Sequence, residues 1–235
     1  MALPKLNDTP KYDIVIPSQN KKVKYRPYLV KEEKVLMMAM ESQDMNAILN
    51  AVVDTITACV QNDIEKDKLT IFDVEYMFTQ IRAKSVGETS KVGIKCKHCE
   101  TSNEIAIDVS SIKIDVPKIS NTIELTSEIT LEMKWPSYDD LISLGIKDTK
   151  SMAQNAFAMI GKCIAAIHTN DERISTKDVP VKELEEFIDS MTKDQFQKVS
   201  AYIEQMPRLI HNVDFNCVSC GETNNIKLEG MSDFF

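Results

Sequence analysis

The sequence predicts an α+β protein in which a helical body is combined with β-hairpins and an interrupted four-cysteine zinc ribbon. Two observations predict this class. Along the chain, apolar residues alternate between the two-residue period of strands and the three-to-four-residue period of helices. Two Cys-x-x-Cys pairs, at Cys96 and Cys99 and at Cys217 and Cys220, are separated by the 117 residues from 100 to 216. A metal ion held by both pairs would join the end of the chain to its middle.

The first part of the chain is expected to form a hairpin followed by three helices. Alternating apolar residues on both sides of a polar turn, Ser18-Gln19-Asn20, predict a hairpin over residues 12–29. Helical spacing then predicts a short helix over residues 30–41. A second helix begins after Ser42, which would cap it, and a third begins near Thr70.

The middle of the chain is expected to return to strands, and a second group of helices follows. Alternating residues surround the first cysteine pair, and a single strand with one apolar face is expected over residues 119–133. The later expected elements are a helix over 138–144, a helix over 153–167, a short strand over 173–175, a helix over 181–191 and a helix capped by Thr192.

These elements divide the chain into five segments. They are an extended arm and hairpin over 1–30, a helical segment over 31–90, the first zinc knuckle with its β segment over 91–134, a helical insertion over 135–208, and the second knuckle with the C-terminal tail over 209–235.

The four cysteines are the strongest chemical signal in the sequence. Each pair lies between extended segments and is followed by Glu-Thr and an Asn, so the two knuckles resemble each other. Cys96, Cys99, Cys217 and Cys220 are therefore predicted to bind one structural Zn²⁺ per chain, because four sulfur ligands leave no open position for water. Iron also accepts such a tetrahedral site. The alternative is a redox pair of thiols, although such a motif normally lies at a strand-to-helix junction.

Composition limits the classes of function. The formal net charge of −8 disfavours general binding to nucleic acid, which needs clustered Lys and Arg. The sequence contains no phosphate-binding loop, nucleophile elbow or His-Glu-x-x-His motif, so an enzyme is not expected. Neither a membrane span nor a signal peptide is expected, which indicates a cytoplasmic product.

The two ends of the chain are candidate partner-binding segments. The N-terminal arm carries Leu3, Pro4 and Leu6 and has little potential to form a core, and the chain finishes with Phe234 and Phe235. Two interpretations stay open for the phenylalanines. They dock on their own domain, or they anchor a neighbouring subunit.

In its overall pattern the chain resembles the baseplate hub subunits and hub assembly proteins of T-even-type contractile-tailed bacteriophages. Besides the two cysteine pairs, the resembling segments are MALPKLN at 1–7, KYRPYLVKEEK at 24–34, FDVEY at 72–76, IRAKSVGE at 81–88 and DFF at 233–235. The resemblance implies a non-enzymatic role in building the baseplate hub, with other hub, tube-initiating or wedge proteins as partners in a multi-copy assembly. It implies a location in the host cytoplasm during assembly and a possible place in the tail baseplate of the virion.

Two other functions remain as alternatives at this point. A zinc ribbon often serves as a nucleic-acid-binding adaptor, which would show salt-sensitive binding to DNA or RNA. A thiol oxidoreductase would instead show two redox-active thiols in a metal-free protein.

Overall fold

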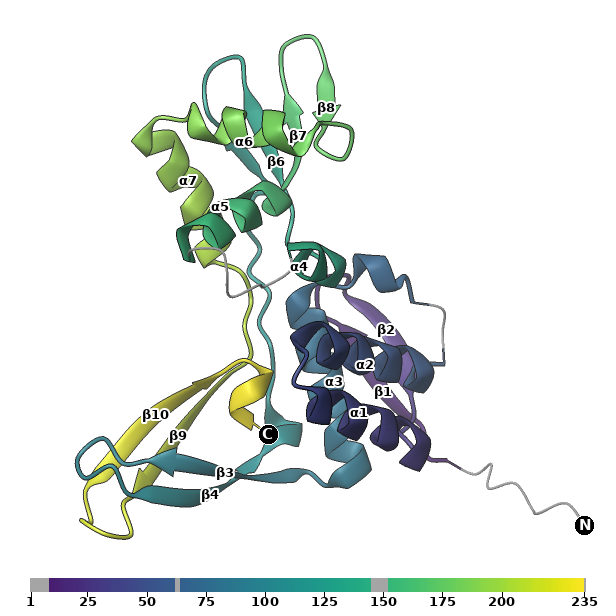
Figure 1. Ribbon diagram of the computed structural model, residues 1–235, viewed down its shortest axis with the longest axis vertical. Helices are drawn as coiled ribbons and strands as arrows, with labels where there is room; N and C mark the ends of the chain where they lie inside the picture. Colours follow the sequence, from purple (N-terminus) through teal and green to yellow (C-terminus); the bar gives the residue numbers. More distant parts are fainter. Residues whose placement is uncertain (1–8, 62–63, 145–151, 235) are drawn as a thin grey trace, which may run out of the picture. The chain divides into compact units, whose positions relative to one another are not determined.

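A computed structural model describes residues 9–61, 64–144 and 152–234 of the chain. The chain divides into two compact units, drawn in Figure 1. Unit 1 comprises Met1–Lys66, Phe72–Asp115 and Arg208–Phe235, and unit 2 comprises Asp67–Ile71 and Val116–Pro207. Unit 1 is therefore assembled from segments on both sides of unit 2 in the sequence.

Within its described residues, unit 1 contains three antiparallel hairpins and three α-helices. Its elements are β1 (Tyr12–Ile16), β2 (Lys21–Tyr25), α1 (Val30–Ser42), α2 (Met45–Cys59), α3 (Ile71–Val86), β3 (Thr89–Lys95), β4 (Ser102–Asp108), β9 (Ile210–Asn216) and β10 (Thr223–Glu229). Short 3₁₀ turns are η2 (Val109–Ser111) and η3 (Met231–Phe234), and η1 (Lys66–Lys68) contains the point in the sequence at which the chain passes from unit 1 to unit 2. The predicted α+β class is confirmed.

The start of α2 differs from the sequence-based expectation. Ser42 is the last residue of α1, and the chain reverses at Gln43, whose φ of 55° lies in the left-handed region. Asp44 then caps α2, because its carboxylate accepts hydrogen bonds from the N–H groups of Asn46 and Ala47. The predicted cap was therefore placed two residues too early.

The hairpin of β1 and β2 is attached to α3 by a buried carboxylate. Asp73 is fully buried, and its two oxygens accept hydrogen bonds from the backbone N–H and the hydroxyl of Ser18, at 2.8 and 2.5 Å. Ser18 lies in the turn between the two strands, so the turn is fixed to the first turn of the helix.

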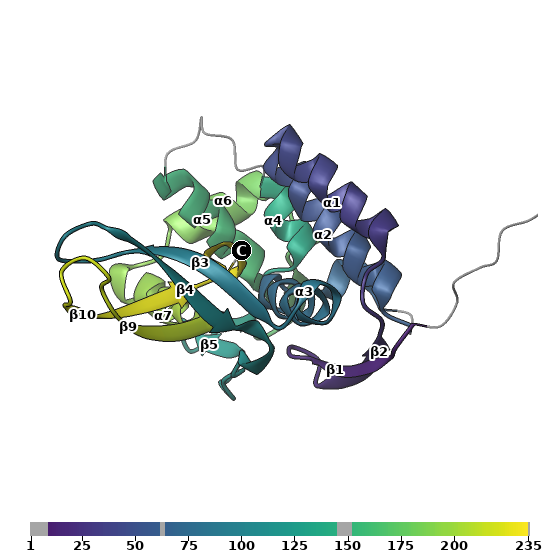
Figure 2. The same ribbon diagram turned by 90° about the horizontal axis from the view of Figure 1, so that it is seen from below.

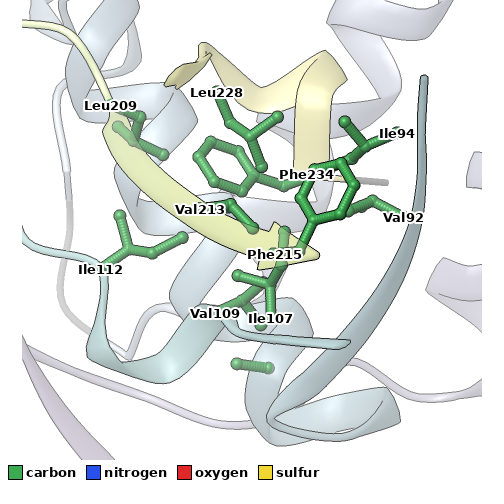
Figure 3. Packing of buried hydrophobic residues seen from close by; sticks show 11 residues of the cluster. Val92, Ile94, Ile107, Val109, Ile112, Leu209, Val213, Phe215, Leu228 and Phe234 are labelled. Carbon is green, nitrogen blue, oxygen red and sulfur yellow. The ribbon is translucent and has the colours of Figure 1, made fainter. Parts of the chain in front are cut away.

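A hydrophobic core joins the two later hairpins of unit 1. Side chains of β3, β4, β9 and β10 meet in one cluster, together with Ala83 of α3 and with Phe234 of η3 (Figure 3). Phe234 is fully buried there, and its carbonyl accepts a hydrogen bond of 2.7 Å from the hydroxyl of Ser90 in β3. The end of the described chain is thus packed into its own core.

The part of unit 2 that the structure describes contains a four-stranded antiparallel sheet and four helices. Its strands follow one another in the order β5-β6-β7-β8. Its elements are β5 (Thr122–Glu124), β6 (Thr130–Met133), α4 (Tyr138–Leu144), α5 (Met152–Cys163), β7 (Ile164–His168), β8 (Arg173–Ser175), α6 (Val181–Asp189) and α7 (Lys193–Glu204). Its core has its own apolar cluster, in which Trp135 stacks on Tyr202 at 4.5 Å between ring centroids.

The strand predicted over residues 119–133 is in fact two strands. The backbone turns back after Leu125, because the hydroxyl of Thr126 accepts hydrogen bonds from the N–H groups of Glu128 and Ile129. Ile123 of β5 then lies opposite Leu131 of β6. The apolar residues before and after the turn still belong to one core, which explains why their alternation resembled that of a single strand.

The helix predicted over residues 153–167 was also too long. Helix α5 ends at Cys163, and the next five residues form β7, which pairs with β6 and with β8. A strand paired on both sides is buried, and a short apolar run does not distinguish such a strand from a helix. His168 therefore ends a strand, where its Nε2 lies 2.9 Å from the carboxylate of Glu132.

Among the described residues, no helix combines the length and the apolar character needed to cross a bilayer. The segment between the two cysteine pairs, which the sequence presents as mostly helical, also carries the complete four-stranded sheet of unit 2.

Candidate metal centre

The two cysteine pairs lie in the turns of two similar hairpins of unit 1. In one hairpin Lys95 of β3 pairs with Ser102 of β4, and in the other Asn216 of β9 pairs with Thr223 of β10. Each turn therefore spans six residues, 96–101 and 217–222, and begins with a cysteine. The β3–β4 and β9–β10 hairpins lie side by side in Figure 1 and Figure 2, although they are far apart in the sequence.

The two turns have the same backbone hydrogen bonds. In each, the N–H of the first cysteine donates across the turn, and its carbonyl accepts from the residue after the second cysteine. The four bonds are Cys96 N to Thr101 O at 2.9 Å, Glu100 N to Cys96 O at 3.0 Å, Cys217 N to Glu222 O at 2.9 Å and Gly221 N to Cys217 O at 2.9 Å. This backbone places both sulfur atoms of a pair on one side of the turn.

The same fold puts one residue of each turn in the left-handed region. These residues are Glu100, with φ of 59°, and Gly221, with φ of 76°. Glycine adopts this conformation without steric cost, whereas a side chain at this position is disfavoured. The two turns therefore share a shape but differ in the strain that it imposes.

The four sulfur atoms meet between the two hairpins. They all lie within 4.8 Å of one another, with 3.7 Å between the sulfurs of Cys96 and Cys220 and 3.6 Å between those of Cys99 and Cys217. A tetrahedral zinc ion with Zn–S bonds of about 2.3 Å separates its sulfur ligands by about 3.8 Å. The donor set and the observed spacing thus fit one metal ion held by four thiolates.

Backbone N–H groups near the first cysteine of each pair favour the ionised form of its sulfur. The N–H of His98 points at the sulfur of Cys96, and the N–H of Ser219 points at the sulfur of Cys217, both at 3.4 Å. The N–H groups of Cys220 and Ser219 lower the pKa of the Cys217 thiol to about 6. Because four thiolates this close repel one another, a bound cation is needed to keep all of them charged.

Two buried asparagines connect the knuckles. The side-chain oxygen of Asn103 accepts from the N–H of Val218, and that of Asn224 accepts from the N–H of Lys97, both at 2.9 Å. Each amide nitrogen donates to a carbonyl of its own turn and lies near the first cysteine sulfur of the opposite turn, 3.7 Å from Cys217 for Asn103 and 3.4 Å from Cys96 for Asn224. Each asparagine is 1% exposed.

Sequence reasoning assigned no role to these asparagines, although it contained the signal for them. Both lie four residues after the second cysteine of a pair, and both knuckles show an asparagine in this region. Only the structure shows that each one contacts the opposite knuckle rather than its own cysteines.

The predicted partner-binding residues fall in different situations. Leu3, Pro4, Leu6 and Phe235 lie outside the described residues. Phe234 packs into the core of unit 1, as the docking interpretation expects.

The remaining cysteines, Cys59 and Cys163, are buried, and burial raises their pKa to about 11 and about 12.

The fold and the site together define an α+β protein with a four-cysteine centre divided between two distant segments. A family model described as "T4 bacteriophage base plate protein" matches residues 9–235, and the chain belongs to this family. The chain is also 24% identical over 226 residues to the "Baseplate hub assembly protein gp26" of Enterobacteria phage T4. That alignment covers 96% of this chain and 97% of the T4 protein.

No solved structure matches the chain. The resemblance noted in the sequence is confirmed, because both comparisons identify base plate proteins and extend over nearly the whole chain.

Proposed function

We propose that this protein acts in assembling the hub of a phage tail baseplate, through contacts with other proteins. The observation that carries the proposal is the alignment with the T4 hub assembly protein over nearly the full length of both chains. An alignment of this extent spans the sequence of both units rather than a small shared motif. A non-enzymatic role agrees with the membership in a base plate family.

The four cysteines would hold one zinc ion with a structural role. Support comes from the sulfur spacing, from the N–H groups that point at Cys96 and Cys217, and from the asparagines that join the two turns. Four thiolates complete a tetrahedral site, so the ion would stabilise the junction of the two hairpins and would not activate a substrate.

The partners would be other hub, tube-initiating or wedge proteins, met in the host cytoplasm during assembly. The arm with Leu3, Pro4 and Leu6 is the proposed contact segment, because it offers apolar residues beside two prolines that restrict the backbone. A short segment with apolar side chains of this kind would suit recognition by a neighbouring subunit.

A genetic lesion tests the proposed function directly. A phage in which this gene is interrupted is grown with and without the chain supplied in trans, and the lysates are examined by electron microscopy. We expect baseplates with a complete hub only when the chain is supplied. Complete baseplates in its absence would refute the role in hub assembly.

Two variants supplied in trans distinguish the contribution of the N-terminal arm to hub assembly from that of the metal site. A chain lacking residues 2–8 is expected to keep the metal content of the intact protein and to lose hub assembly. A Cys217→Ser, Cys220→Ser chain is expected to lose both. A truncated chain that assembles hubs normally would exclude the arm as the contact segment.

A further inference from the structure

Helix α1 exposes an unusual amount of apolar surface. Residues 35–40 form an uninterrupted apolar run, Val-Leu-Met-Met-Ala-Met, in the middle of the helix. A helix that is apolar on all sides is normally covered on all sides. Here Glu32 is the only buried residue of the helix, and it lies at the start.

One side of α1 is covered by the next helix. The two helices lie side by side in Figure 1 and Figure 2. Glu32, Leu36 and Ala39 share one face, at spacings of four and three, and are the buried or half-buried residues of α1. This is the face toward α2 and the body of unit 1.

The opposite face is open and has a simple pattern. Lys34 and Glu41 lie at its two ends, and Met37 and Met38 lie between them, 58% and 61% exposed. Val30 continues this face toward the start of the helix and is 79% exposed. Val35 and Met40 border the face on either side and are also exposed. Methionine-rich faces of this type are adaptable contact surfaces.

The pattern is self-complementary under reversal. The midpoint of the apolar run lies between Met37 and Met38, and Lys34 and Glu41 lie at equal distances on either side of it. When two such helices pack antiparallel about a twofold axis, Lys34 of each lies opposite Glu41 of the other. Met37 of each lies opposite Met38 of the other.

We propose that α1 packs antiparallel against α1 of a second copy of this chain, forming a twofold-symmetric dimer. Twofold contacts use the same patch on both subunits and require this kind of reversed complementarity. A parallel arrangement would instead put Lys34 on Lys34 and Glu41 on Glu41, which repel. The charge pattern therefore selects both the occupant and its direction.

The contact is small, because one 13-residue helix from each copy forms its centre. Stable interfaces bury roughly 800 Å² on each partner. The dimer is therefore expected to dissociate on dilution, with a dissociation constant in the micromolar range, and to be favoured where many copies gather.

Sedimentation of the full chain over protein concentrations from about 1 to 200 μM tests this. We expect the mass to rise from that of the 26.6 kDa chain toward twice that value. The Lys34→Glu variant and the Glu41→Lys variant each replace two attractive pairs by two repulsive ones, so each should weaken dimerisation by at least about tenfold. The variant with both substitutions restores opposite charges and should dimerise as the parent does.

Lys118→Glu is the matched control, because it makes the same change of charge at an exposed position of unit 2. It should leave the dimer unchanged. Circular dichroism and metal content should be the same in all variants, since the substituted side chains are exposed. A parent chain that stays monomeric at every concentration, or a double variant that fails to dimerise, would overturn the proposal, as would capture of α1 by a different hub protein without self-association.

Discussion

Asn103 and Asn224 form reciprocal hydrogen bonds, each to the backbone of the other asparagine's cysteine turn. Each asparagine belongs to the strand that leaves one cysteine turn, and its side-chain oxygen accepts the N–H of the residue that follows the first cysteine of the other turn. The two hairpins have no strand pairing with each other, since β3 and β4 form one sheet and β9 and β10 another. The exchanged side chains therefore supply directional contacts where the strands do not.

Replacing either asparagine should weaken metal binding. Asn103→Ala and Asn224→Ala each remove a hydrogen bond between a buried asparagine side chain and a backbone N–H of the opposite turn, which contributes about 0.5–1.5 kcal/mol. Residues that orient metal ligands typically change metal affinity by about 10–100-fold. Competition with a chromophoric chelator measures the affinity, and we expect similar losses for the two variants because their contacts are equivalent.

Asn225→Ala is the control for these variants. Asn225 is the neighbour of Asn224, but it is exposed and bonds to the carboxylate of Asp214 on the surface. Its substitution should leave metal affinity unchanged. Equal losses of metal affinity in Asn225→Ala and Asn224→Ala would show that the hydrogen bonds between the two cysteine turns do not determine metal binding.

Removing the metal should destabilise unit 1 and leave unit 2 folded. The cysteines join two hairpins of unit 1, whereas unit 2 has an apolar cluster of its own. Structural zinc contributes to folding directly. We expect calorimetry of the chelated protein, or of Cys217→Ser, to show one transition lowered by at least about 10 °C and a second one unmoved.

Cys163→Ala provides the reverse control. Cys163 is fully buried in the core of unit 2, so its truncation should lower the transition of unit 2 and leave one metal ion per chain. A Cys217→Ser protein with full metal content and two unchanged transitions would contradict the four-sulfur site.

The left-handed residues of the two turns predict opposite effects of substitution. Gly221→Ala puts a side chain where φ is 76° and should destabilise unit 1 by about 1 kcal/mol. Glu100→Gly removes a side chain from φ of 59° and should be neutral or stabilising by a few tenths to about 1 kcal/mol. Urea denaturation measures both, and a stabilising Gly221→Ala would show that the turn changes shape.

An ion pair at the start of α1 predicts a pH-dependent contribution to stability. The carboxylate of Glu32 lies 2.9 Å from the guanidinium of Arg26, and the two side chains are 8% and 15% exposed. Burial raises the pKa of Glu32, but hydrogen bonds from Arg26 and from the N–H of Leu29 outweigh it, so the pKa lies below its ordinary 4.5. The pair therefore stabilises the fold fully above pH 4.5 and loses this effect as the pH falls through the lowered pKa.

Glu32→Gln should accordingly lower the free energy of unfolding by about 1–3 kcal/mol at pH 7. The difference from the parent should shrink as the pH is lowered below 4.5. Glu33→Gln, at the exposed neighbouring position, should have little effect at any pH. A difference between Glu32→Gln and the parent that grows on acidification would contradict the sign of the shift.

Local patterns were sufficient to predict many elements of this fold. The hairpin turn, the cap at Thr192 and the extended segments around each cysteine pair all depend on nearby residues, and Thr192 forms the expected cap with Gln195. The bounds of β7 did not follow from the sequence, because its strand character comes from pairing with β6 and β8 on both sides. Propensity alone does not contain that pairing.

In the candidate site, too, the features set by neighbouring residues could be predicted, and those set by contacts between distant segments could not. Cys-x-x-Cys spacing predicts that each pair shares one ion, and the structure brings the two pairs together. The reciprocal contacts of Asn103 and Asn224 depend on the relative placement of two hairpins, which no local pattern encodes.

The division of the cysteine centre also sets an order of events during protein synthesis. After Cys99 is made, the ribosome must add the 117 residues from 100 to 216 before Cys217 exists. At about 5–20 residues per second this takes roughly 6–23 s. Over that interval the β3–β4 hairpin has two cysteines and no partner, while the sequence of unit 2 is already complete after Pro207. Unit 1 therefore cannot be completed until all of unit 2 has been synthesised, and a nascent chain stalled before Cys217 should leave Cys96 and Cys99 open to alkylation.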